Sequence, residues 1–174
     1  MLLLKFLKQL FQILNGEVAP RQVAGGIAFG MILGLTPTFS LHNLVVVFLI
    51  CIIRVNVSAV IFSWLLFGLA SWAIDPLSHQ LGYLLLVRME FLKPLWTVFY
   101  NMPLIPLTGF NNTLLLGSLV ISLILFYPGL IASEKGVLAY RASVKPRLEK
   151  LRIFQVLKAS WIYQWYARIS NFRN

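Results

Sequence analysis

The sequence predicts an all-α integral membrane protein, with a broken or re-entrant helical hairpin and about three to four further membrane segments. Of its 174 residues, 59% are hydrophobic and only 11% are charged, and the mean hydropathy is +0.83. Soluble domains carry about 25% charged residues, so this chain has too little polar surface to cover a soluble globule. Proline, glycine and polar residues also interrupt its apolar stretches, which predicts broken helices.

The formal net charge of +10 would suggest nucleic-acid binding in a soluble protein. Here the basic residues lie outside the apolar runs, and nine of the fifteen follow Ala132. This distribution predicts contact with anionic lipids, no nucleic acid, and both termini on the cytoplasmic side of the membrane. A solvated basic tail without a partner is the simpler alternative.

Three regions follow from this composition. Residues 1–16 form an amphipathic pattern of about 20 Å as a helix, too short to cross the membrane, so we expect an interfacial helix. Residues 17–132 form the membrane domain. Residues 133–174 form a basic tail, where an apolar stripe and several Trp and Tyr residues predict a helix on the membrane surface.

The central feature is an uncharged run of 31 residues, from Val23 to Ile53. As one helix it would measure about 46 Å, which is too long for one comfortable crossing and too short for two. Pro37 lies near its middle and predicts a helix over 20–35, a break, and a second helix over 39–53. The pair forms either a re-entrant hairpin or one kinked crossing. The hairpin is favoured because it keeps Arg54 on the cytoplasmic side.

Polar residues gather at this break, where irregular backbone must be surrounded by protein or by a water-filled cavity. We therefore expect them to face the interior and to form the candidate site: Thr36, Pro37, Thr38, Ser40, His42 and Asn43. An intramembrane histidine is a candidate functional group, although a structural hydrogen bond to a broken-helix carbonyl explains His42 equally well.

Gly26, Gly30 and Gly34 recur every four residues before the break. Small side chains at this spacing let helix backbones approach closely in a membrane. Packing within the chain is the favoured explanation, and a homodimer or a sliding gate helix is the alternative.

Further segments follow in order. Residues 57–74 form a span of about 27 Å that we expect Asp75-Pro76 to end. Residues 77–87 are too short to cross, and 94–110 are expected to be irregular or re-entrant because Asn101, Pro103 and Pro106 interrupt them. The clearest span covers 114–131, with a cap at 111–113.

A second tier of polar residues comprises Arg54, Asn56, Asp75 and His79. Asp75 and His79 lie four apart, so a proton or anion relay with Arg54 and Arg88 is conceivable, but Asp-Pro is more often a turn and cap signal. No metal-ligand cluster, phosphate-binding loop or nucleophile with a base is apparent in the sequence. We therefore expect no metal, no cofactor and no enzymatic activity.

The order and spacing of several motifs resemble the bacterial domain of unknown function 2062 family, over residues 17–90. The matching positions are Ala19-Pro20, the run from Ala24 to Gly34, Pro37, Arg54-Val55-Asn56 and Asp75-Pro76-Leu77. The chain departs from the family at Ser40, His42 and Asn43, where glycine and glutamine are usual, and at Asp75, where asparagine is usual. These departures indicate a divergent branch.

This resemblance implies a multi-pass protein of the bacterial inner membrane without an established activity. Related domains sit beside glycosyltransferases in some proteins, which implies lipid-linked saccharide or envelope chemistry. The sequence thus leads to two hypotheses. In the first, the protein binds or transports an amphiphile or lipid-linked envelope intermediate. In the second, it is a scaffold that binds other membrane proteins or a second copy of itself.

Overall fold

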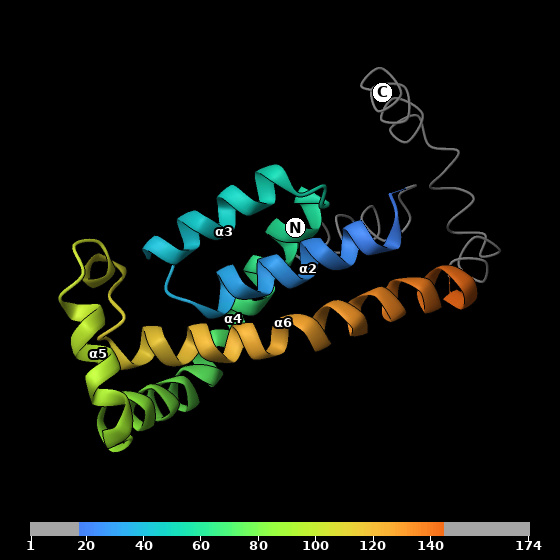
Figure 1. Cartoon of the computed structure of the whole chain (residues 1–174). Coiled ribbons are helices and arrows are strands. Elements are labelled where there is room, and N and C mark those ends of the chain that lie inside the picture. The colour runs from blue at the N-terminus through green and yellow to red at the C-terminus, as the bar shows by residue number, and fades with distance from the viewer. Residues whose placement is uncertain (1–17, 145–174) are drawn as a thin grey trace.

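The computed structural model describes residues 18–144, in which every regular element is a helix (Figure 1). The interfacial helix expected at 1–16 and the tail beyond 144 lie outside the described residues. The longer helices are α2 (Pro20–Leu35), α3 (Leu41–Ile52), α4 (Val57–Tyr83), α5 (Lys93–Tyr100) and α6 (Thr113–Ala139). Short π turns (Leu84–Arg88, Tyr140–Val144) and 3₁₀ turns (Glu90–Leu92, Ile105–Thr108) extend or connect them.

Helix α2 is the core of the molecule. Eleven of its sixteen residues are buried, because α3, α4 and α6 pack around it. Pro20 stands in its first turn, where a missing backbone donor costs nothing. The helix predicted over 20–35 is therefore confirmed in both type and bounds.

The chain reverses direction after α2. Helix α3 runs back beside α2 in the opposite direction (Figure 1). The backbone N–H of Asn56, just after α3, donates to the carbonyl of Gln22 in the first turn of α2 at 3.0 Å. The break at Pro37 is thus the tip of a helical hairpin, which was the favoured arrangement of the two.

Helix α4 then runs parallel to α2 at very close range. An ideal Cβ on Gly26 would lie 2.5 Å from the carbonyl oxygen of Asn56, and one on Gly34 would lie 2.8 Å from the nitrogen of Gly68. Gly30 stands between them, against the backbone of Val60. The three glycines therefore serve packing within the chain, and α4 fills their face.

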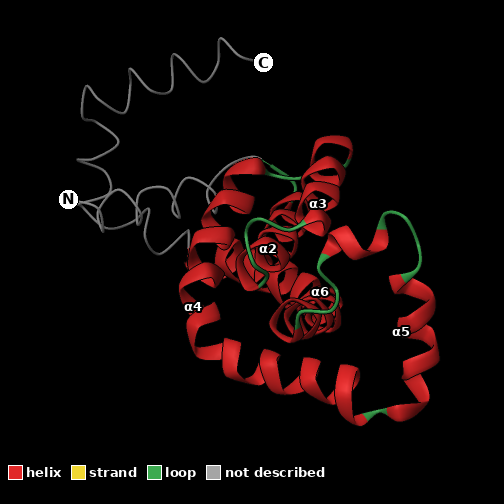
Figure 2. Ribbon diagram, turned by 90° about the vertical axis from the view of Figure 1, so that its left-hand side faces the viewer, coloured by secondary structure: helices red, strands yellow, loops and turns green. Residues whose placement is uncertain are grey.

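The expected helix end at Asp75-Pro76 is wrong. Helix α4 continues through Pro76 to Tyr83 and into the π turn that ends at Arg88. A proline inside a helix kinks or breaks it, and here α4 continues but changes direction along its length (Figure 2). Its first half packs on α2, and its second half packs on α6 through Gly82 and Gly117.

Helix α6 runs antiparallel to α2 and α4. The carboxamide oxygen of Asn112 accepts hydrogen bonds from the backbone nitrogens of Leu114 and Leu115 at 2.9 and 3.3 Å, which confirms the expected cap. The helix continues past Pro128-Gly129 to Ala139, so it crosses the boundary expected at 132. At its far end Val137 packs with Val23 and Ala59.

Two apolar stretches among the described residues are long enough to cross a membrane by length and composition: Val57–Arg88 with 32 residues and Thr113–Ser143 with 31. Helix α3 is apolar but shorter, and α5 has eight residues. The two long stretches contain the two spans expected over 57–74 and 114–131. Of the other expected segments, 77–87 extends α4 and is not separate, and 94–110 folds into short helices.

Charged residues collect toward the two ends of this bundle. One end, where α2 begins and α6 finishes, carries Arg21, Arg54, Glu134, Lys135 and Arg141. The other carries Arg88, Glu90 and Lys93, while Asp75 lies further along α4, within one turn of Ser78, which packs on Gly117 of α6. Between them α6 is uncharged for about 30 Å, and many large apolar side chains are exposed, including Phe48, Leu69, Trp72 and Ile124.

Candidate functional site

The polar residues at the hairpin break meet in one turn, with Asn43 at its centre. The Asn43 side-chain nitrogen donates to the carbonyls of Pro37 at 2.9 Å and Thr38 at 3.3 Å. Its oxygen lies 2.9 Å from the Thr36 hydroxyl, which also lies 2.7 Å from the carbonyl of Ile32. Asn43 and Thr36 are both buried, so these bonds satisfy backbone groups that the broken helix leaves unpaired.

Ser40 and His42 complete the turn. The Ser40 hydroxyl donates to the carbonyl of Pro37 at 2.9 Å and lies 3.1 Å from Nε2 of His42. The Nδ1 atom of His42 is buried without a hydrogen-bond partner among the described residues, whereas Thr38 and Phe39 are exposed at the tip. The structure brings the six expected residues together, and their polar atoms mainly hold the turn closed.

The second-tier residues are dispersed. Asn56 caps α4 by accepting a hydrogen bond from the backbone of Ala59 at 2.9 Å. Arg54 is exposed at the same end, and about 27 Å of helix separate that end from Asp75. His79 pairs through Nδ1 with the Thr113 hydroxyl at 2.7 Å, joining α4 to the start of α6. Because Arg54 and Asp75 lie far apart, no relay joins them.

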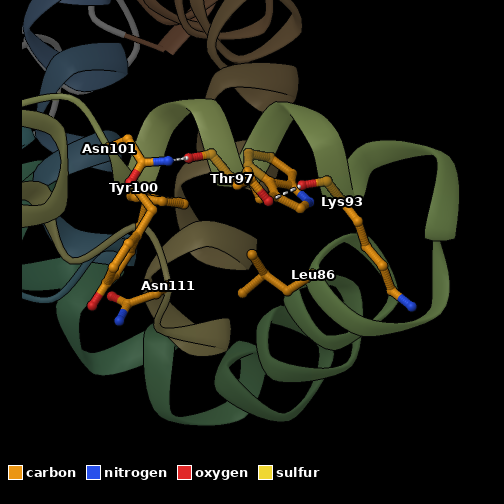
Figure 3. Close-up of a pocket in the computed structure, with 8 residues that line it drawn as sticks. Leu86, Lys93, Thr97, Tyr100, Asn101 and Asn111 are labelled. Carbon is orange, nitrogen blue, oxygen red and sulfur yellow. Dashed lines mark hydrogen bonds between the residues drawn. The ribbon is translucent and has the colours of Figure 1, made fainter.

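The structure contains a recess that the sequence did not predict. It has a volume of about 510 Å³ and lies between α5, the π turn after α4, and the segment before α6 (Figure 3). Its lining residues are Leu86, Lys93, Trp96, Thr97, Tyr100, Asn101, Phe110 and Asn111. We call it the α5 recess.

Helix α5 turns its polar side toward this recess. Lys93, Thr97 and Asn101 follow one another at four-residue spacing and share that side. Leu95 and Val98 are exposed on the opposite side. A helix on a soluble protein turns its apolar residues inward, so the exposed Leu95 and Val98 indicate apolar surroundings on the outer side of α5.

Aromatic side chains form the floor of the recess and fix α5 in place. Trp96 stacks on Phe110 with ring centroids 5.9 Å apart, and Phe99 meets both rings edge-on. The indole N–H of Trp96 donates to the carbonyl of Leu85 at 3.0 Å. This bond ties α5 to the π turn after α4. The signal in the sequence was the four-residue spacing of polar residues within a stretch interrupted by prolines.

The recess has little net charge. Lys93 is its charged lining residue, and its ammonium bonds the carboxylate of Glu90 at 2.9 Å. The other polar groups are the hydroxyls of Thr97 and Tyr100 and the carboxamides of Asn101 and Asn111. Such a set binds by hydrogen bonds and apolar contact, and it contains no nucleophile with an adjacent base.

The fold and the recess define a helical protein with two apolar helices of membrane-spanning length. The chain belongs to the bacterial family described as "Uncharacterized protein conserved in bacteria (DUF2062)", whose family model matches residues 4–145. It is also 28% identical over 156 residues to an uncharacterized protein of Treponema pallidum (strain Nichols), a match that covers 90% of this chain and 96% of the relative. No solved structure matches it. The family resemblance is thus confirmed, and it extends beyond the expected 17–90.

Proposed function

We propose that this protein is a multi-pass protein of the bacterial inner membrane that binds an amphiphile in the α5 recess. The observation that carries the proposal is a recess at the margin of an apolar belt, beneath a helix whose outer side is apolar, with a mainly apolar lining that also holds a few polar side chains. That arrangement suits a molecule with a polar headgroup and a hydrocarbon tail.

Membrane insertion is supported by the exposed side chains and the charges. The uncharged interval on α6, about 30 Å long, equals the thickness of a bilayer's hydrocarbon core. The end that carries Arg21, Arg54, Lys135 and Arg141 is the more basic one, and the positive-inside rule assigns such an end to the cytoplasm. Anionic lipid headgroups are the natural partners there. The α5 recess would then open near the outer surface of the membrane.

The size and position of the recess also support an amphiphile. Small-molecule sites have volumes of about 300–1,000 Å³, and the recess has about 510 Å³. Exposed apolar side chains of the same segment, among them Leu95, Leu104 and Leu107, offer a surface for a hydrocarbon tail. The headgroup would occupy the recess while the tail stays among the lipids.

Transport is an extension of this proposal. Helix α3 contacts the 3₁₀ turn Ile105–Thr108, so the hairpin and the recess segment are neighbours. Discontinuous helices beside a polar site are typical of secondary transporters. Flux of a fluorescent amphiphile across reconstituted liposomes, beyond that of empty liposomes, would extend the function from binding to transport.

Photocrosslinking tests the binding proposal directly. A benzophenone amino acid replaces Tyr100 in the recess, or Tyr127 as the matched control, since these side chains are 61% and 68% exposed. After irradiation in nanodiscs of bacterial polar lipids, mass spectrometry identifies the lipid adducts. We expect position 100 to enrich particular lipids and position 127 to reflect the bulk composition. Identical adducts at the two positions would refute a binding site in the recess.

A scaffold role has one structural feature in its favour. Helix α3 buries only Asn43 and Val46 among its twelve residues, so its outer side offers an apolar surface to another membrane protein or a second copy. The glycine side of α2 is filled by α4 and offers no such surface. Two results together would favour the scaffold. A partner protein would co-purify in stoichiometric amount and would no longer do so when exposed α3 residues are substituted, and the lipid adducts at position 100 would reflect the bulk lipid composition.

A further inference from the structure

We infer that the exposed side of α4 docks a membrane helix of another protein, and that Asp75 pairs with a basic side chain of that helix. The inference rests on the membrane insertion proposed above and is independent of the α5 recess. It follows from the spacing of the exposed residues on α4, from the depth of Asp75, and from the sequences of the helices packed around it.

A stripe of residues at alternating four- and three-residue spacing runs along the exposed side of α4. Its members, which we call the α4 seam, are Ile61, Leu65, Gly68, Trp72 and Asp75. Trp72 is 87% exposed, Ile61, Leu65 and Gly68 are also exposed, and Asp75 is half-buried. A Cβ on Gly68 would have the carbonyl oxygen of Gly34 as its nearest neighbour, at 4.0 Å. Two helices pack along a line of this spacing, and a glycine within it lets a partner backbone approach closely.

Asp75 lies at a depth where the surroundings are hydrocarbon. Ser78, three residues further along α4, packs on Gly117, which is four residues inside the start of α6. About 10 Å of the uncharged stretch of α6 therefore extends beyond Asp75 toward the outer end. An aspartate side chain is too short to reach the headgroups from that depth, so its carboxylate needs a partner within the membrane.

The described helices supply no basic partner at this depth. Lysine and arginine are absent over 57–87 of α4, over 113–133 of α6 and over the whole of α3, and α2 has only Arg21, at the opposite end. His79, one turn further along α4, is the nearest titratable side chain on the same helix, and its Nδ1 lies 2.7 Å from the Thr113 hydroxyl. Ionisable residues in a membrane pair with one another, so we assign the counter-charge of Asp75 to another chain.

A second copy of this chain and lipid alone both fit the seam poorly. Two copies with the same orientation in the membrane would pack by two-fold symmetry and bring the two Asp75 carboxylates together, where like charges repel. Hydrocarbon chains would cover Leu65 and Trp72 but leave the carboxylate without a counter-charge. A helix with apolar residues and one lysine or arginine satisfies both parts of the seam.

Binding of model helices in liposomes tests the inference. The probes are polyleucine peptides of about 20 residues, which carry lysine, leucine or aspartate about 10 Å from one end. A donor dye on Cys51, the single cysteine of the chain and exposed on α3, and an acceptor on the peptide report association by energy transfer. We expect the lysine peptide to associate about tenfold more tightly than the leucine peptide. The aspartate peptide should associate no more tightly than the leucine peptide.

Variants of the seam provide the second arm. Asp75→Asn should remove the advantage of the lysine peptide, because the amide carries no charge. Glu90→Gln is the matched control, because the Glu90 carboxylate is exposed and pairs with Lys93 outside the seam. Trp72→Ala should weaken binding of the lysine and leucine peptides about threefold, whereas Tyr127→Ala, at an exposed aromatic residue of α6, should not. Circular dichroism of each variant verifies that the helices are intact.

The failures are distinguishable. Equal association of the lysine and leucine peptides, or an unchanged lysine advantage in Asp75→Asn, overturns the inference. Energy transfer between two labelled copies of the protein that is lost in Trp72→Ala would make the occupant a second copy and overturn it as well. Release of the protein from liposomes by alkaline carbonate would overturn the inference together with membrane insertion. If the lysine peptide binds selectively but the adducts at positions 100 and 127 are the same, the inference stands and amphiphile binding fails.

Discussion

Replacing Gly30 with alanine tests the close contact between α2 and α4. A Cβ at this position would meet the carbonyl oxygen of Val60, and it would lie 2.7 Å from the Ser63 Cβ and 3.0 Å from the Trp64 nitrogen. Ordinary contacts begin at 3.4 Å, so relieving the Ser63 contact alone requires the two helices to separate by about 0.7 Å, and the closer Val60 oxygen requires more, which a close-packed interface resists.

The expected cost combines two effects. Overpacking a tight interface costs about 1–3 kcal/mol. Separation also strains the bond from the Ser63 hydroxyl to the carbonyl of Ile27, which is 2.7 Å long and links the two helices, and its loss costs about 1 kcal/mol. Alanine regains about 0.5–1 kcal/mol because it favours the helix more than glycine. We therefore predict a net destabilisation of about 1–3 kcal/mol.

The assay is reversible unfolding in mixed micelles, followed by far-ultraviolet circular dichroism as the fraction of denaturing detergent rises. Gly136→Ala is the matched control, because no heavy atom lies within 4 Å of a Cβ at that helical position. We expect Gly136→Ala to be neutral or stabilising by up to about 1 kcal/mol. Equal free energies of unfolding for the two variants would refute the close packing of α2 on α4.

Three further predictions use the same unfolding measurement. Asn43→Leu should destabilise the protein by about 2–3 kcal/mol, because it leaves buried carbonyls at the hairpin tip unpaired, whereas Thr38→Ala, at an exposed side chain, should have little effect. Asn112→Ala should cost about 1 kcal/mol because it removes the cap of α6; an unchanged stability would contradict this capping role. Gly117→Ala should cost about 2–3 kcal/mol by the same overpacking argument, because its Cβ would meet the backbone of α4. Gly129→Ala should be tolerated, because its Cβ would meet only the end of a methionine side chain.

Local signals in the sequence predicted the hairpin well. Pro20 and Pro37 bracket α2, and the glycines at four-residue spacing predicted where another helix would lie against it. They could not identify that helix, because only the fold brings the backbone of Val60 next to Gly30. In the structure α4 lies against all three glycines, which agrees with the favoured packing within the chain.

The second half of the chain was less predictable. Asp75-Pro76 is a strong local stop signal, but packing against α6 at Gly82 outweighs it, so the helix bends and continues. The α5 recess was missed for a related reason. Its walls come from segments on either side of Pro94 and Pro106, and the contact between Trp96 and Phe110 that joins them is not encoded by any short pattern.

The polar residues at the helix break lie together as the sequence predicts, but their hydrogen bonds hold the turn and are not directed at a ligand. Thr36, Ser40 and Asn43 make these bonds within the turn. Backbone groups freed by Pro37 need partners wherever water is scarce, and these side chains supply them. Nδ1 of His42 is the buried polar atom of this turn that has no partner among the described residues.

The most direct test of the account is the sidedness of two positions in the membrane. With the exposed Cys51 replaced by serine, single cysteines are introduced at Arg54, beside the start of α4, and at Asn111, at the recess. A membrane-impermeant maleimide is applied to spheroplasts and to inverted vesicles. We predict that Asn111→Cys is labelled only in spheroplasts and Arg54→Cys only in inverted vesicles. Labelling of both cysteines from the same side would contradict it.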